Sequence, residues 1–370
     1  MTRRVAAVSA TPAVDAAVED IFGTAELGTG LTVAGVALAD RAARYLTDEP
    51  NTLRYARDVL RGTDAPVSGD ELVDVVTSPE ALTVLVAAAA DRPPEYCRPT
   101  RSSRMRVLRH GEDRLYFDTD AVPDHVVRHG PGRLTVAAIP GPDRCRFGVR
   151  YLRELWYRQL RAEGFSCFHA SSVRMPSGGV VLLVGDSGAG KTTLALALCV
   201  YGGGELVANE RTLVRPNDDG IEVVGLPSAI RLDDRTVRMF GWQNWIGQPC
   251  WNPERNRKAK LERLPGELAR WTGIGSSCGG PLEAVLLPGP ELAGTGWIEG
   301  TAEHVRETLR RNCYSPVDPL WPEDWLGIGD TSTASTTTVV PRLIAGTRFM
   351  TCRTAGPPST LVRHIDSLLG

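Results

Sequence analysis

The chain has 370 residues, 42 % of them hydrophobic, which is enough for two or three domains with well-buried cores. Lys and Arg number 42 and Asp and Glu number 44, so the formal charge is −2. This near balance argues against nucleic acid or an anionic membrane as a partner of the whole chain. No run of the sequence approaches the roughly 20 apolar residues that cross a bilayer.

The first residues and the cysteines predict a cytoplasmic location. Two arginines precede a mildly apolar stretch, but Asp15 and Glu19 interrupt it early, so a secretory signal peptide is not expected. The eight cysteines are scattered and form no Cys-x-x-Cys pair, which is atypical of a disulfide framework or a zinc site. We therefore expect free thiols in a reducing compartment.

Residues 1–95 are predicted to form a mostly helical domain of unknown role. Apolar residues recur at helical spacing in LTVAGVALADRAARYL (31–46) and in SPEALTVLVAAAAD (78–91). We find no cluster of residues typical of catalysis in this part of the sequence.

Residues 96–147 are predicted to be a linker and a small β-rich segment. The stretch 91–104 is polar and contains three prolines, which is typical of a boundary between domains. The pattern then alternates over 104–119, which predicts a hairpin, and residues 132–140 predict a further strand.

Residues 148–370 have the pattern of an α/β domain. A helix is predicted over 148–164, with one strand over 165–173 and a nearly all-apolar strand over 179–185. A short strand at 205–208 follows the next helix, and a hairpin is predicted over 211–232. The apolar face of the first helix consists of Val149, Leu152, Leu155, Trp156 and Leu160.

A glycine-rich turn follows the apolar strand and matches Gly-x-x-x-x-Gly-Lys-Ser/Thr at every fixed position. Its glycines permit a loop that closes around an anion, and the helix after it directs its positive end to the same point. A chance match in a chain with 38 glycines is the alternative, but the strand before the turn and the helix after it are the context that a phosphate-binding loop requires. The predicted nucleotide-binding residues are Gly185, Asp186, Ser187, Gly188, Ala189, Gly190, Lys191, Thr192 and Thr193.

In such a loop Lys191 would contact the terminal phosphates and the hydroxyl of Thr192 would bind Mg²⁺. The segment FHASSV (168–173) precedes the loop, and ELVANERTLV (205–214) follows it. Together these three segments resemble the HPr kinase/phosphorylase family and its relatives with the phosphoenolpyruvate-carboxykinase-like fold. The resemblance covers about residues 148–235.

The resemblance implies a P-loop core that uses ATP and Mg²⁺ to phosphorylate a hydroxyl group. The acceptor would be a seryl side chain of a protein or peptide, or a hydroxyl of a small metabolite, and the protein would be a homo-oligomer. The glycine-rich signature that these kinases carry near residue 231 is missing, so neither the reverse, phosphorolytic reaction nor HPr as a substrate is expected.

Two aspartates of the family correspond to Asn209 and Glu210 in this sequence. Asn209 cannot accept a proton, although its oxygen could bind Mg²⁺, whereas Glu210 could act as general base or metal ligand. Three interpretations follow: an active kinase, a nucleotide-binding regulatory or assembly module that transfers phosphate slowly or not at all, or an unrelated hydrolase. For Glu210 the alternative is an ordinary surface ion pair with Arg211.

Two further residues complete the predicted site. His169 in the upstream strand could bond the acid or a phosphoryl oxygen, and Arg231 suits the phosphate oxygens. For His169 the alternative is a core or strand-end histidine bonded to the backbone, and for Arg231 it is a solvated arginine at the end of a strand. The segment 240–265, with its tryptophans followed by Arg255, Arg257, Lys258 and Lys260, is predicted to cap the nucleotide or substrate, the alternative being a solvated loop.

Overall fold

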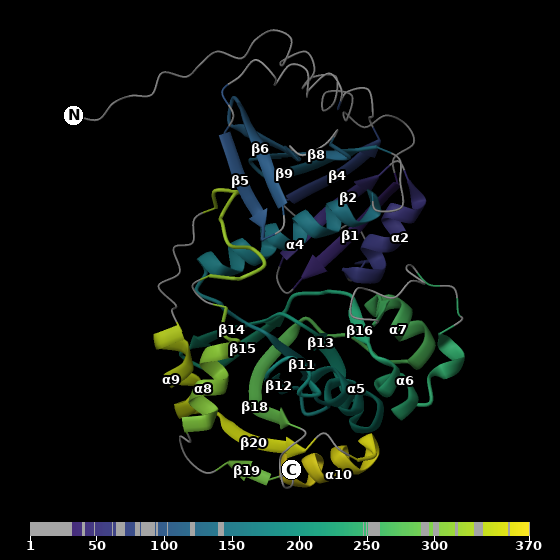
Figure 1. Cartoon of the computed structure of the whole chain (residues 1–370), viewed down its shortest axis with the longest axis vertical. Helices are drawn as coiled ribbons and strands as arrows, with labels where there is room; N and C mark the ends of the chain where they lie inside the picture. Colours follow the sequence, from purple (N-terminus) through teal and green to yellow (C-terminus); the bar gives the residue numbers. More distant parts are fainter. Residues whose placement is uncertain are drawn as a thin grey trace, which may run out of the picture.

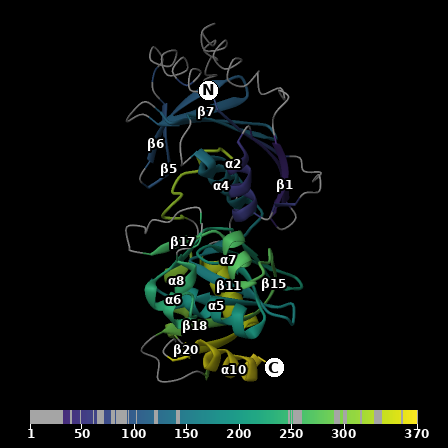
Figure 2. The same cartoon turned by 90° about the vertical axis from the view of Figure 1, so that its right-hand side faces the viewer.

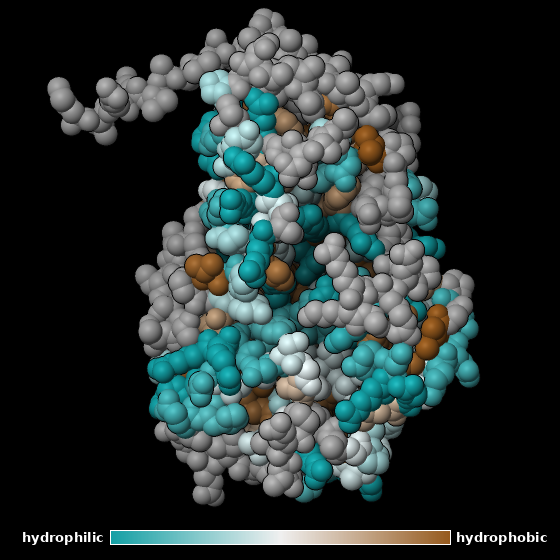
Figure 3. Space-filling model, in the orientation of Figure 1, coloured by the Kyte–Doolittle hydropathy of each residue, from teal (hydrophilic) through white to brown (hydrophobic). Residues whose placement is uncertain are grey.

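The computed structural model describes residues 32–38, 41–47, 49–60, 62–63, 71–77, 82, 93, 95–101, 103–118, 123–139, 144–246, 248, 250, 260–289, 296–298, 303–314, 317–328, 336–353 and 356–369. In this part of the chain the protein is a mixed α/β structure with two large sheets, one above the other in Figure 1. Among these residues, no helix combines the length and the apolar character needed to span a bilayer. Most of the residues coloured in Figure 3 are hydrophilic, and the hydrophobic ones form small separate patches.

The first sheet contains nine strands in the order β3-β1-β2-β4-β9-β8-β7-β6-β5. The pairs β2–β4 and β4–β9 are parallel, and the other neighbours are antiparallel. The strands are β1 (Thr32–Leu38), β2 (Arg41–Thr47), β3 (Gly62–Thr63), β4 (Glu71–Thr77), β5 (Glu95–Thr100), β6 (Ser103–His110), β7 (Asp113–Asp118), β8 (His125–Gly130) and β9 (Arg133–Ala138).

The prediction of a mostly helical domain over residues 1–95 is wrong for the residues described there. Apart from Leu82, which is helical, they form the strands β1 to β4, the first residue of β5 and the helix α2 (Pro50–Val59). The predicted helix 31–46 is instead the antiparallel pair β1–β2. Its many small apolar residues fit a helical spacing and a strand equally well, so burial in the sheet decides the structure. Most of the second predicted helix, 78–91, lies outside the described residues. The hairpin β6–β7 and the strand β9 confirm the predictions for residues 104–119 and 132–140.

Helices α2 and α4 (Arg144–Ala162) fill the concave side of this sheet, which curves over them in Figure 2. The five apolar residues predicted to share one face of α4 are all buried. They belong to a hydrophobic core that also includes Tyr45 and Val73 of the first sheet and Leu213 and Val224 of the second. The helix α4 therefore lies between the two sheets and contacts both through one continuous core.

The second sheet follows the order β10-β14-β15-β18-β12-β11-β13, with β20 beside β18 and β19 beside β20. The predicted strand 165–173 is two strands, because the chain changes partner at His169. The elements that follow α4 in the chain are β10 (Ser166–Phe168), β11 (Ala170–Arg174), β12 (Val180–Val184), α5 (Lys191–Gly202), β13 (Glu205–Ala208), β14 (Thr212–Asn217) and β15 (Gly220–Gly225). The elements after them are β16 (Ile230–Leu232), α6 (Asp234–Met239), β17 (Leu261–Arg263), α7 (Pro265–Thr272), β18 (Gly279–Gly289), β19 (Gly296–Ile298), α8 (Glu303–Asn312), α9 (Thr336–Gly346), β20 (Arg348–Arg353) and α10 (Pro358–Leu369).

Helices cover both faces of the second sheet. Leu183 of β12 packs into a core with α5 and α10, whereas Leu182 and Val184 pack into another core with α8 and α9. All five residues of β12 are buried, which confirms the prediction that this strand is buried on both faces. The end of β12 and the start of α5 are thus held rigidly at one edge of the packed layers.

Candidate functional site

The loop between β12 and α5 adopts a conformation that depends on its glycines. Gly188 and Gly190 have φ angles of 89° and 95°, in the left-handed region that residues with a Cβ rarely adopt. Gly190 is also the residue that precedes the first turn of α5. The loop therefore ends where the free N–H groups and the positive end of α5 can face an anion.

Lys191, the first residue of α5, folds back onto this loop. Its Nζ donates hydrogen bonds to the carbonyl oxygens of Gly185 at 2.5 Å and Asp186 at 3.1 Å. Burial lowers the pKa of Lys191 to about 8, although the nearby charges of Asp186 and Glu210 act in the opposite direction. The ammonium group is thus held at the loop by neutral carbonyl groups, which a bound anion could replace as its partner.

Asn209 follows β13 and faces the first turn of α5. Its Oδ1 accepts a hydrogen bond from the hydroxyl of Thr192 at 3.0 Å, and its backbone oxygen accepts one from Ser171 Oγ at 2.8 Å. Both Asn209 and Ser171 are buried, so the contact to Ser171 holds the backbone of Asn209 while the contact to Thr192 orients its amide. Two uncharged oxygens therefore meet beside the loop, and oxygen is the ligand atom that Mg²⁺ prefers.

Glu210 is held by an arginine from the neighbouring two-stranded sheet β16–β17. Arg231 of β16 donates one hydrogen bond to Glu210 Oε1 at 2.6 Å and another to Glu262 Oε1 of β17 at 3.0 Å. The two strands pair antiparallel with Arg231 opposite Glu262, so the register of this pair places the two side chains next to each other. Burial acts to lower the pKa of Arg231, but the two carboxylates outweigh it and the pKa is raised.

The alternative pairing of Glu210 with its neighbour Arg211 does not occur. Arg211 makes a buried, two-bond ion pair with Asp318, at 3.0 and 3.1 Å, and its guanidinium lies 4.4 Å from the ring centre of Trp321. The opposite charge of Asp318 raises the pKa of Arg211 despite the effect of burial. Asp318 is 107 residues away in the chain, so no local pattern could have identified it.

His169 lies between β10 and β11 and is partly a structural residue. Its backbone N–H bonds to the carbonyl of Asn312 at 2.7 Å, and its ring stacks on Tyr314 with 5.7 Å between the centroids. Burial, helped by the charge of Lys191, lowers the pKa of His169 to about 4, so the imidazole is neutral near pH 7. Tyr314 is a site residue that the sequence reasoning missed.

These side chains surround one cleft with a volume of about 560 Å³. Seven predicted site residues from the start of α5 and from the strand ends line this cleft: His169, Lys191, Thr192, Thr193, Asn209, Glu210 and Arg231. Ser187, Gly188 and Gly190 also line it, whereas Gly185, Asp186 and Ala189 of the predicted loop do not. The wall includes Arg211, Asp233, Thr236, Lys260, Glu262, Tyr314 and Leu320, none of which the sequence reasoning assigned to the site except Lys260.

Part of the predicted capping segment packs elsewhere. Trp242 stacks on Phe240 at 4.6 Å and contacts Trp245 at 4.8 Å, and both tryptophans line a small apolar hollow away from the cleft. Lys260 does line the cleft, but Trp251 to Lys258 lie outside the described residues. Trp242 and Trp245 therefore pack against neighbouring apolar residues and do not cover the cleft.

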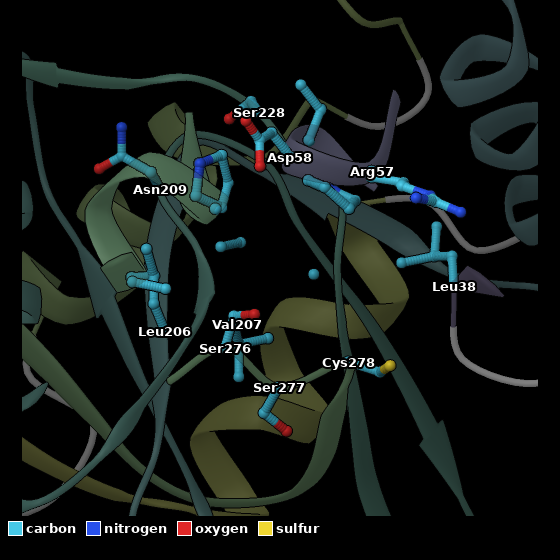
Figure 4. Close-up of a pocket in the computed structure, with 17 residues that line it drawn as sticks. Leu38, Arg57, Asp58, Leu206, Val207, Asn209, Ser228, Ser276, Ser277 and Cys278 are labelled. Atoms are coloured by element: carbon cyan, nitrogen blue, oxygen red, sulfur yellow. The ribbon is translucent and has the colours of Figure 1, made fainter. Parts of the chain in front are cut away.

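A second cavity, of about 250 Å³, lies where α2 approaches β13 and α7. Asn209 contributes to its wall as well, but in Figure 4 the amide of Asn209 points away from the centre of this cavity. Asp58 of α2 forms a two-bond ion pair with Arg270 of α7 beside it, at 2.6 and 2.9 Å. Helix α2 in the first half of the chain is thus bonded directly to α7 in the second half.

Within the described part of the chain, no group of three or more His, Cys, Asp or Glu residues is placed to hold a metal ion. A scan of protein-family models found no match to the chain, and a search of curated proteins found none either. The chemistry of the cleft has to be argued from its own residues.

Proposed function

We propose that the protein is an ATP- and Mg²⁺-dependent kinase that transfers the γ-phosphate to a hydroxyl group. The acceptor would be a seryl side chain of a protein or peptide, or a hydroxyl of a small metabolite. The observation that carries this proposal is that Lys191, Asn209 and Glu210 line the same cleft. The resemblance of residues 148–235 to HPr kinase/phosphorylases, with their P-loop core and phosphoenolpyruvate-carboxykinase-like fold, points to the same chemistry.

The phosphates of ATP would lie against the glycine-rich loop. Backbone N–H groups at the start of α5 and the ammonium of Lys191 are the donors available there, and they match a triphosphate in charge. Lys191 would exchange the carbonyl groups of Gly185 and Asp186 for phosphate oxygens. Arg231, on the other side of the cleft, suits the oxygens of the γ-phosphate.

Thr192 and Asn209 are the residues that would hold Mg²⁺, together with the phosphates; Glu210 would be a further ligand only if it does not act as the base. Their two side-chain oxygens, which are hydrogen-bonded to each other, fit an ion that binds few protein groups and keeps several waters. The metal, when bound, supplies positive charge that offsets the charge of the phosphates.

Glu210 is the proposed general base. Its carboxylate would accept the proton of the acceptor hydroxyl while the acceptor oxygen bonds to the γ-phosphorus and the bond to the leaving oxygen of ADP breaks. Arg231 and Glu262 hold the Glu210 side chain in one orientation at the wall of the cleft. The neutral imidazole of His169 can bond a phosphoryl oxygen or the acid without adding charge.

The second candidate is a nucleotide-binding regulatory or assembly module. Two observations favour it. Asn209 stands where the family has the first of its two aspartates, and the carboxylate of Glu210 is paired with Arg231. In such a module the nucleotide would set the conformation of the chain, and the first half, which packs on the same core, would contact the partner.

The two candidates are separated by incubating the protein with γ-labelled ATP, Mg²⁺ and a cytosolic extract. Label on an acceptor that is lost in Glu210→Gln, by at least about a hundredfold in rate and with nucleotide affinity unchanged, supports the kinase. Nucleotide binding without any labelled acceptor supports the module. A chain that does not bind nucleotide, with Lys191→Ala behaving like the wild type, contradicts both.

A further inference from the structure

Two bulky side chains with large apolar surfaces line one end of the cleft. Leu320 lines it and is 49 % exposed, and Tyr314, which also lines it, is partly buried. Folded proteins expose single apolar residues often, so exposure alone indicates no function. What these two residues can contact depends on where the fold places them relative to Glu210.

The register of the strands places Tyr314 at the corner of the cleft that holds Glu210. Strand β10 pairs with β14 and β11 pairs with β13, in registers that set residues 169–171 opposite residues 209–211. His169 therefore lies beside the segment that contains the proposed base. The ring of Tyr314 is nearly parallel to that of His169, at an angle of 10° with 5.7 Å between the centroids. The backbone N–H of Tyr314 bonds to a carbonyl of β10 at 2.7 Å, which holds the ring in this place.

Leu320 is fixed at the same end of the cleft by the buried ion pair of Arg211. Oδ1 of Asp318 accepts one hydrogen bond from Arg211 Nη2 at 3.1 Å and another from the backbone N–H of Leu320 at 2.8 Å. Arg211 directly follows Glu210, so a single carboxylate oxygen connects the backbone of Leu320 to the residue after the proposed base. Asp318 and Trp321, on either side of Leu320, are buried, whereas the side chain of Leu320 stays exposed in the cleft.

The charged residues at this end of the cleft are held in ion pairs. The guanidinium that follows Glu210 is paired with Asp318, and Glu210 itself is paired with Arg231. Beside these pairs the cleft presents the ring of Tyr314 and the side chain of Leu320. Covering them with an apolar group removes apolar surface from water on both sides of the contact, which is favourable. This end of the cleft therefore suits an apolar group better than a further charge.

We propose that Tyr314 and Leu320 form an apolar platform that binds a hydrophobic side chain next to the seryl residue of a peptide or protein acceptor. The acceptor hydroxyl must come within hydrogen-bond reach of Glu210, so the group that carries it lies beside the platform. Neighbouring residues of a peptide are about 3.8 Å apart, which brings the side chain next to the serine over these two residues. The inference rests on the proposed kinase function. Of the two acceptor classes it selects the peptide or protein, because a small polar metabolite would leave the platform uncovered.

The test compares two pools of short seryl peptides, one with Leu on both sides of the serine and one with Asn, which is similar in size but polar. Each pool is titrated onto the full chain with Mg²⁺ and a non-hydrolysable ATP analogue, so that the measurement does not depend on turnover. We expect the wild type to bind the Leu pool about tenfold more tightly, as for the burial of one large apolar side chain. Leu320→Ser should reduce this preference to about threefold or less, and Leu320→Met, which keeps an apolar side chain, should retain most of it.

The matched control is Val317→Ser. Val317 is 61 % exposed and lies three residues before Leu320, but it is not among the residues that line the cleft. Its replacement should therefore leave the preference for the Leu pool at the wild-type value. The affinity for the ATP analogue should be the same in the wild type and in all three variants.

Equal binding of the two pools by the wild type, or binding of neither, overturns the inference, and so does an unchanged preference in folded Leu320→Ser. A loss of nucleotide affinity in Leu320→Ser also overturns it, because Leu320 would then contact the nucleotide. Labelling with γ-labelled ATP separates this inference from the kinase proposal. If the Leu pool binds selectively but receives no label, the apolar platform stands and the kinase proposal fails. If both pools are bound and labelled equally, the kinase proposal stands and the platform fails.

Discussion

The hydroxyl of Thr192 donates a hydrogen bond to Oδ1 of Asn209 over 3.0 Å, which links the first turn of α5 to the end of β13. The two residues are 17 positions apart in the chain, and the sheet order places β11 between β12 and β13. The contact therefore depends on the chain crossing one strand before it returns to the loop. It brings together the two oxygens on which the proposed metal site depends.

Replacing Asn209 by aspartate should tighten the binding of Mg²⁺. Asp keeps the oxygen that accepts from Thr192 and adds a negative charge, so the Mg²⁺ concentration for half-maximal nucleotide binding should fall by about three- to tenfold. A Mg²⁺ titration monitored with a fluorescent nucleotide measures this. Asn217→Asp, which adds the same charge at the exposed end of β14, should leave the titration unchanged. An identical Mg²⁺ dependence in Asn209→Asp and wild type would remove Asn209 from the metal site.

Nucleotide affinity should fall as the pH rises above about 8. The pKa of Lys191 is lowered to about 8, so its ammonium is charged below that pH and neutral above it. Phosphate favours the charged form, so the dissociation constant should increase by as much as about tenfold per pH unit above pH 8. Binding measured from pH 6.5 to 9.5 tests this. Lys191→Arg, whose guanidinium stays charged throughout, should give a flat profile at high pH, and a flat profile in the wild type would contradict the role of Lys191.

Removing Asp318 should destabilise the protein strongly. Asp318 is 2 % exposed and its loss leaves the buried Arg211 without a partner, for which we expect a loss of about 3–5 kcal/mol in the free energy of unfolding. Urea unfolding of Asp318→Ala measures it, with the exposed turn variant Asp219→Ala as a control near zero. The double variant Arg211→Met/Asp318→Leu should recover most of the loss. A small effect in the single variant would show that Arg211 finds another partner or water.

Glu154 of α4 should make the stability depend on pH. It is fully buried, accepts a hydrogen bond from Trp325 Nε1 at 2.5 Å, and has one carboxylate oxygen without a partner. Burial raises its pKa from 4.5 to about 7, although Arg158 and Trp325 act against this shift. The folded protein therefore holds the proton more tightly than the unfolded chain. The stability that comes from this proton is complete below about pH 4.5 and is lost as the pH rises to 7.

The variant Glu154→Gln keeps an acceptor for Trp325 but cannot ionise. Its free energy of unfolding relative to the wild type should rise between pH 5 and pH 8, by up to about 3 kcal/mol. Urea unfolding of both proteins at the two pH values gives this difference directly. A difference that is the same at pH 5 and pH 8 would mean that Glu154 does not change protonation in this range.

The sequence by itself was sufficient to predict those features of the structure that depend on residues close together in the chain. The glycines at 188 and 190, the buried strand β12 and the apolar face of α4 are each contained in one short segment, so periodicity and backbone preference identify them. The same reasoning failed for residues 31–46, where small apolar residues fit a helix as well as a strand.

Only the tertiary structure decided which charged side chains meet. Glu210 pairs with Arg231 and not with the adjacent Arg211, which instead finds Asp318 107 residues away. Such contacts follow from how sheets and helices pack, and burial then makes each pairing, or each missing partner, energetically important.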